Sequence, residues 1–98
     1  MAQLLGWGSV PAPSPYGRQV SRAKYRAKQA GFTGPHFTAT EWLALVEASG
    51  GRCLRCGGAE DLTVDHIVPL ALGGSNLISN IQPLCATCNG IKEREVAD

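Results

Sequence analysis

The chain lacks any long hydrophobic run, and its aromatic residues are few. No apolar stretch approaches the ~20 residues that a membrane span needs, which argues against a transmembrane protein. The first residues include no basic side chain beside their short apolar patch, so we expect no secretory signal. Aromatic residues make up only 6% of the 98 residues, which predicts a small hydrophobic core. A domain of this size commonly needs a metal ion, disulfides or a partner to stay folded.

Acidic residues are missing from the first 40 positions. That segment carries five basic residues, whereas the rest of the chain carries four basic and eight acidic residues. The formal net charge of +1 therefore conceals a basic arm attached to a mildly acidic body. This asymmetry indicates a polyanionic partner, with nucleic acid as the first candidate. The basic residues of the arm, which we assign to DNA binding, are Arg18, Arg22, Lys24, Arg26 and Lys28.

Composition divides the chain into three parts. Residues 1–17 are rich in proline and glycine, and we expect an extended or disordered tail there. Residues 18–37 are expected to form a basic arm or helix followed by a linker, in which His36 is interpreted as a surface residue. Basic side chains spread around that helix and leave no clean apolar face, so it is expected to become ordered only on DNA or to remain a solvated tail. The folded domain is expected over residues 38–98.

A helix over roughly 39–49 is predicted at the start of the folded domain. Thr38 and Glu41 have the spacing of a capping box, in which each residue satisfies a backbone N–H of the other. Trp42 and Leu45 then begin an apolar stripe at helical spacing, which predicts that Trp42 belongs to the core rather than to a base-stacking surface.

Two short strands and a final helix are predicted after this helix. Residues 62–64 favour a strand that runs into Asp65 and His66. A second strand is expected to open at residues 81–82, at an edge or an end because a proline follows. Residues 86–96 contain no proline and predict a C-terminal helix.

Four cysteines form two Cys-x-x-Cys pairs, Cys53 with Cys56 and Cys85 with Cys88. One tight turn can present both sulfurs of a pair to one ion, and two such turns complete a tetrahedral Cys₄ zinc site. Four protein ligands close the coordination sphere, so this zinc is expected to be structural. An iron centre in the same thiolate cage and a redox-active cysteine pair are the alternatives.

The segment between the cysteine pairs carries polar residues in a recognisable order. They are Asp65, His66, Pro69, Gly73, Gly74, Asn76 and Asn80, with Asn89 directly after the last cysteine. Together with the cysteine pairs, this pattern resembles the HNH endonuclease family over about residues 42–92. The resemblance implies an α+β fold, a small zinc-stabilised ββα-metal (His-Me finger) domain, here preceded by an amphipathic helix and the basic N-terminal arm. The small, free-standing, phage-type members are the most similar.

The resemblance implies a role for each of four positions. His66 would be the general base, because a neutral imidazole can take the proton of a water molecule. Asp65 and Asn89 would hold a catalytic divalent cation, and Asn80 would hold the loop that carries the base. Position 89 is often histidine in the family, and two oxygen ligands predict Mg²⁺ or Mn²⁺ rather than Zn²⁺. The two motif asparagines, Asn76 and Asn80, could instead be turn formers.

Two geometric expectations follow for the site. Asp65 and His66 cannot face the same side of a regular strand, so either the strand ends at them or they flank the phosphate from different sides. The proline and glycines that follow favour a strand end and a loop fixed by Asn80. Lys92 lies three residues after Asn89 on the same helical face, where it could contact a DNA phosphate.

These residues predict a metal-dependent DNA endonuclease that nicks duplex DNA with low sequence specificity. We expect it to act in the cytoplasm, that of the host if it is phage-encoded. Similarity to phage-type members implies a further role as an accessory to the DNA-packaging motor, with the terminase as partner. The alternative is a non-catalytic zinc module that binds DNA or a protein.

Overall fold

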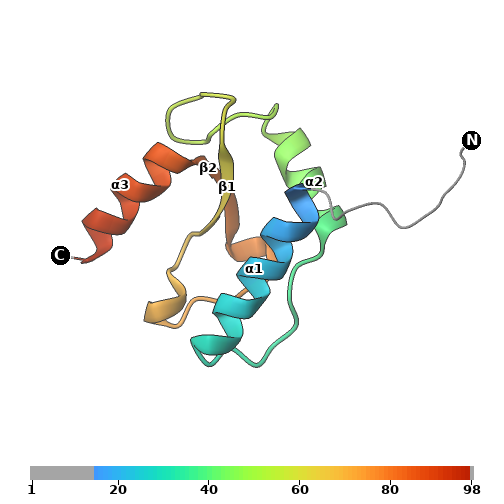
Figure 1. Cartoon of the computed structure of the whole chain (residues 1–98), viewed down its shortest axis with the longest axis vertical. Helices are drawn as coiled ribbons and strands as arrows, with labels where there is room; N and C mark the ends of the chain where they lie inside the picture. Colours follow the sequence, from blue (N-terminus) through green and yellow to red (C-terminus); the bar gives the residue numbers. More distant parts are fainter. Residues whose placement is uncertain (1–14, 98) are drawn as a thin grey trace, which may run out of the picture.

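The computed structural model describes residues 15–97, and it is a small α+β fold (Figure 1). The predicted fold class is therefore confirmed. Within residues 15–97, no helix is long and apolar enough to cross a membrane. In chain order, the elements are α1 (Pro15–Gln29), α2 (Ala39–Ala48), β1 (Leu62–His66), the 3₁₀ turns η1 (Leu70–Leu72) and η2 (Ile78–Asn80), β2 (Ile81–Cys85) and α3 (Ala86–Ala97).

The two strands pair antiparallel, from Leu62 opposite Cys85 to His66 opposite Ile81. Within residues 15–97 each strand has only one neighbour, so Pro83 can lie within β2 without removing a ladder bond that the sheet needs. Helix α3 begins at the residue directly after β2. In Figure 1, α3 lies on one side of the hairpin, whereas α1 and α2 lie on the other. The β1–β2–α3 unit is the predicted ββα arrangement.

Helix α2 begins as predicted. The Thr38 hydroxyl accepts a hydrogen bond from the Glu41 amide at 3.1 Å, and the Glu41 carboxylate accepts one from the Thr38 amide at 2.9 Å. This capping box fixes the first turn. Trp42 is fully buried, which confirms its assignment to the core.

Helix α1 differs from the prediction. It begins at Pro15, inside the range expected to be tail, while residues 1–14 of that tail lie outside the described residues. The expectation that this segment lacks an apolar face and becomes ordered only on DNA is wrong. Ala23 and Ala27 are fully buried, and Ala23 packs in the core with the partly buried Val20 against it. Alanine is common in helices because it is a strong helix former, so a sequence does not show which alanines are buried against the core.

One core joins the N-terminal helices to the hairpin. Its buried members are Ala23, Phe37, Trp42, Val46, Val64 and Ile81. Two hydrogen bonds of Gln19 lie beside this core. The Trp42 indole donates to Gln19 Oε1 at 2.7 Å, and Gln19 Nε2 donates to the Leu62 carbonyl at 2.8 Å. Gln19 therefore connects α1, α2 and β1 at a single point.

Candidate functional site

The four cysteine sulfurs gather at one end of the hairpin, all within 4.8 Å of one another. Cys56 and Cys85 are 3.7 Å apart between their sulfurs. Four sulfurs at ~2.3 Å from a tetrahedral metal ion would be about 3.8 Å apart, so the cage has the size of such a site. Cys85 closes β2 and Cys88 lies in the first turn of α3, whereas the first pair lies in the loop after α2. The cysteines are thus positioned to bind one metal ion.

Backbone amides surround these sulfurs. The Cys53 sulfur accepts from the Arg55 and Cys56 amides at 3.4 and 3.5 Å, and the Cys85 sulfur accepts from the Cys88 amide at 3.4 Å. Burial raises the pKa of the Cys53 thiol, but backbone hydrogen bonds outweigh this effect and lower it to about 6. A hydrogen bond to Cys85, together with burial, raises the pKa of Cys88 to about 12. A shared cation would allow all four groups to be thiolates together.

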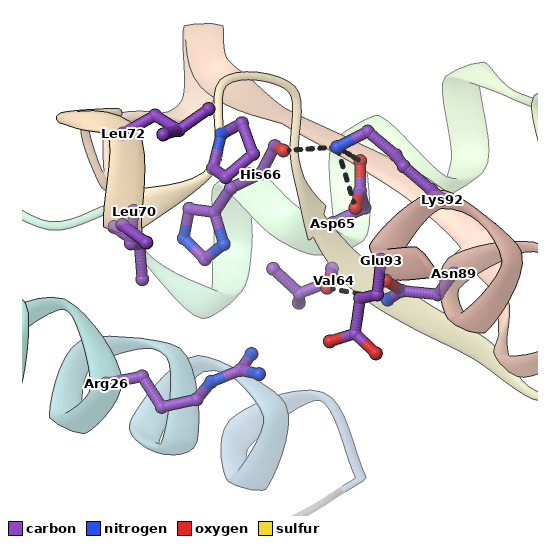
Figure 2. Close-up of a pocket in the computed structure, with 11 residues that line it drawn as sticks. Arg26, Val64, Asp65, His66, Leu70, Leu72, Asn89, Lys92 and Glu93 are labelled. Carbon is purple, nitrogen blue, oxygen red and sulfur yellow. Dashed lines mark hydrogen bonds and ion pairs between the residues drawn. The ribbon is translucent and has the colours of Figure 1, made fainter. Parts of the chain in front are cut away.

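A cavity of about 440 Å³ opens at the other end of the hairpin (Figure 2). Asp65 and His66 of β1 line it together with Asn89 of α3, so the structure brings three of the four predicted catalytic residues into one cleft. Helix α1 adds Arg26 to the same lining. The cleft is therefore lined by β1 and the loop after it, by α3 and by α1.

Asp65 is a buried carboxylate that forms an ion pair with Lys92. It is 6% exposed, and it accepts a hydrogen bond from Gln82 at 2.8 Å. The Lys92 ammonium lies 3.1 Å from Asp65 Oδ2 and donates to the His66 carbonyl at 2.8 Å (Figure 2). Lys92, which was expected to contact a DNA phosphate, thus points inward to Asp65.

Asn89 lies beside Asp65 on the α3 side of β1. Its amide nitrogen donates to the Thr63 hydroxyl at 2.8 Å, and Thr63 is two residues from Asp65 on the same strand face. Because the nitrogen of the amide faces the strand, the amide oxygen is the atom left to bind a ligand.

His66 lies at the end of β1 and, by the alternation of the strand, on the face opposite Asp65. Both residues are part of the strand, which ends directly after them, and they approach the cleft from different sides. His66 is 8% exposed, and its Nε2 lies 2.8 Å from Asn76 Oδ1. Burial lowers the pKa of His66, and although the Asn76 hydrogen bond raises it, the charge of Arg26 lowers it further. A neutral imidazole is therefore favoured at neutral pH.

Asn80 closes the loop between the strands. Its amide oxygen accepts from the Val68 amide at 2.9 Å, and its nitrogen donates to the carbonyls of Val68 and Ser75 at 3.0 and 2.8 Å. Gly74 lets the two sides of this loop approach, since a Cβ at that position would lie 1.8 Å from the Val68 oxygen. Asn80 thus has the contacts expected of a residue that fixes the loop after the candidate base.

A second cavity, of about 460 Å³, runs between α1 and β1. Arg18, Arg22 and Arg26 line it, and their spacing of four residues places them on one helix face. Tyr25 and Asn89 are also in its lining, so this groove shares Arg26 and Asn89 with the first cavity. The expected scatter of basic residues around α1 is therefore only partly correct.

Asn76 and His36 make a contact that the sequence analysis did not predict. Asn76 is fully buried, and its Nδ2 lies 2.8 Å from Nδ1 of His36. The interpretation of His36 as a surface linker residue is only partly correct, because it lies in the linker but is half-buried and hydrogen-bonded. The contact joins positions 40 residues apart, and no local pattern marks it.

Comparison with known proteins agrees with this geometry. Residues 52–95, which include both cysteine pairs and the hairpin, match the family model described as HNH endonuclease. Among curated proteins, none matches this chain. HNH domains are usually nucleases and typically bind DNA. This match over residues 52–95 confirms the resemblance to the HNH endonuclease family that the sequence motifs predict.

Proposed function

We propose that this protein is a metal-dependent DNA endonuclease that nicks duplex DNA with little sequence preference. The observation that carries the proposal is the shared cleft, in which a buried carboxylate, an amide and an imidazole meet. The chemistry of phosphodiester hydrolysis needs a base for water and a positive charge for the phosphate. Within one cavity, His66 offers the base, and Asp65 and Asn89 offer oxygen ligands for a cation that would supply the positive charge.

The ligand set fits a small divalent cation. The Asp65 carboxylate is buried with the Lys92 ammonium against it, so the site already stabilises a positive charge at this position. Carboxylate and amide oxygens are hard ligands, and we therefore expect Mg²⁺ or Mn²⁺ to be preferred over Zn²⁺. A divalent cation held by Asp65 and Asn89 would neutralise the phosphate and stabilise the departing 3′-oxygen. The Cys₄ cage would hold zinc in a structural role, since all four positions are filled by protein.

His66 would act as the general base. It takes one proton from a water molecule while the water oxygen bonds to phosphorus and the bond from phosphorus to the 3′-oxygen breaks. The products would be a 5′-phosphate and a 3′-hydroxyl, as the family resemblance implies. Asn80 would keep the loop after His66 closed so that the imidazole stays in the cleft. One such site in each chain implies nicking rather than double-strand cleavage.

The arginine face of α1 supplies the path for DNA. Arg18, Arg22 and Arg26 line a groove that leads to the candidate site, and guanidinium groups bind phosphate oxygens well. Such contacts are electrostatic and carry no base information, which favours weak sequence specificity. An association with the phage terminase stays a prediction from the resemblance.

Plasmid nicking tests this function. The full-length, zinc-loaded protein should convert supercoiled plasmid to the open circle with Mg²⁺ or Mn²⁺ and should be inactive without added divalent cation. Asp65→Asn removes the charged ligand at constant shape and should abolish nicking while plasmid binding is kept. Glu93→Gln is the matched control, because Glu93 lines the same cleft without an assigned role, and it should keep most of the activity. Plasmid binding with no nicking under any divalent cation would instead support the non-catalytic zinc module.

The groove gives a second test, based on salt. Because α1 is part of the core, deleting it would unfold the protein, so point substitutions are needed. Each lost phosphate contact should reduce the slope of log affinity against log salt by about 0.9. The double variant Arg22→Gln/Arg26→Gln should therefore lower the slope by about 2 and weaken DNA binding. Arg94→Gln removes an exposed charge outside both cavities and should leave the slope unchanged, while equal slopes in all variants would place DNA elsewhere.

A further inference from the structure

Three side chains from separate parts of the chain form a continuous hydrogen-bonded row. His66 Nε2 lies 2.8 Å from Asn76 Oδ1, and Asn76 Nδ2 lies 2.8 Å from His36 Nδ1. Asn76 in the middle is fully buried, so both ends of its amide depend on these partners. The row begins at the candidate base and ends at a residue outside the segment that matches the HNH family.

The amide gives this row a direction. An amide oxygen only accepts and an amide nitrogen only donates, so His66 Nε2 must carry a hydrogen and His36 Nδ1 must carry none. A neutral His66 with its hydrogen on Nε2 has Nδ1 free as the basic nitrogen. If the amide were reversed, Nε2 would become the acceptor and Nδ1 would carry the hydrogen. The orientation of one buried amide thus decides which nitrogen of His66 can accept a proton.

His36 is held so that it can impose this orientation. The next residue, Phe37, is buried in the core, and its amide donates to the Asn76 carbonyl at 2.8 Å. The Phe32 ring packs edge-on against the His36 ring, with centroids 5.6 Å apart. Asn76 is therefore bound through its main chain by Phe37 and through its side chain by His36.

The surroundings of His36 favour its neutral form. Burial lowers its pKa, and the charges of Lys24 and Lys28 on α1 lower it further. Only the neutral ring can offer Nδ1 as an acceptor to the Asn76 amide. Both lysines lie on the helix that carries Arg18, Arg22 and Arg26.

We infer that His36 is a positioning residue for His66, acting through Asn76 to fix the orientation and the tautomer of the candidate base. The expected effect of His36 on catalysis rests on the proposed function. Its expected effect on the tautomer of the His66 imidazole does not. It also explains why residues N-terminal to the family segment pack against the loop that follows the base. His36 does not line the cleft and does not touch the reacting atoms.

Two substitutions of His36 separate positioning from packing. His36→Leu introduces an apolar side chain of similar size that offers no acceptor to the Asn76 amide. His36→Gln offers a carbonyl oxygen to the same amide and should restore the row. His36 is half-buried in a linker and outside the hydrophobic clusters, and thermal melting should confirm that both variants stay folded.

The first measurement is the tautomer of His66, read from ¹⁵N chemical shifts and two-bond couplings in the full-length, zinc-loaded protein without DNA or added divalent cation. The wild type should show hydrogen on Nε2 of His66, His36→Leu should show a mixture, and His36→Gln should resemble the wild type. A wild-type ring with its hydrogen on Nδ1, or a tautomer unchanged in His36→Leu, would overturn the inference. This result stands even if no nuclease activity is found.

The second measurement is plasmid nicking under the conditions of the functional test. His36→Leu should lower kcat by about 10- to 100-fold with little change in KM, since it misaligns a group without removing a substrate contact. His36→Gln should recover most of that loss. Equal losses in the two variants would mean that His36 acts through packing alone and would contradict the inference.

Discussion

Replacing His66 with alanine should slow plasmid nicking by about 10²–10⁴-fold, the contribution typical of a positioned general base. His66 is the only histidine in the lining of the candidate cleft, and its lowered pKa keeps it able to accept a proton at neutral pH. DNA affinity should hardly change, because the arginine groove and not the imidazole is expected to bind phosphate. The measurement is the initial nicking rate at saturating Mg²⁺ for both proteins, with plasmid binding measured in parallel.

Folding and catalysis must be separated in that experiment. The substitution leaves the buried Asn76 oxygen without a partner, which costs about 1–3 kcal/mol of stability. Thermal melting of His66→Ala should therefore show a folded protein with a lower Tm. Added imidazole should enter the open cleft and restore part of the rate. A folded variant that nicks as fast as the wild type would show that another group is the base.

Removing the metal from the cysteine cage should unfold the hairpin and α3. Zinc bound to comparable peptide sites contributes about 10–16 kcal/mol at neutral pH, whereas a whole domain is stable by only about 5–15 kcal/mol. Around the cage, the described part of the chain buries only Cys53, Leu84 and Cys88, with the partly buried Leu62 and Cys85 packed against them. Addition of a strong chelator should therefore abolish the cooperative melting transition, followed by circular dichroism.

Two controls make the zinc result specific. Excess Zn²⁺ should restore the transition, whereas excess Mg²⁺ should not, because thiolates select the softer metal. Cys85→Ser should behave like the chelated wild type, since it removes a ligand at the joint between β2 and α3. A chelated protein that keeps its transition would mean that the hydrophobic core suffices without the metal.

Much of the fold could be predicted because its signals are local. The capping box before α2, the short β-prone run of β1 and the proline-free stretch of α3 each depend on neighbours in sequence. The cysteine spacing also predicted the cage, because two residues between thiolates fit one turn. The cleft could be predicted only as far as the family motif extends, which includes Asp65, His66, Asn80 and Asn89.

What could not be predicted depends on contacts between distant segments. Helix α1 packs through alanines, which a sequence shows as helix formers rather than as core residues. The pairing of His36 with Asn76 and that of Lys92 with Asp65 arise only when the chain is folded. In each case, a polar residue is satisfied by a partner at least 27 positions away.

The shared core sets the smallest fragment that can be studied in isolation. Val64 and Ile81 belong to the recognisable HNH segment, but they pack beneath Ala23, Phe37 and Trp42, which precede it. Cutting at the edge of the family match would expose this apolar surface to water and invite aggregation. The family match therefore begins later in the chain than the segment that folds as one unit. Fragments made for expression should retain α1.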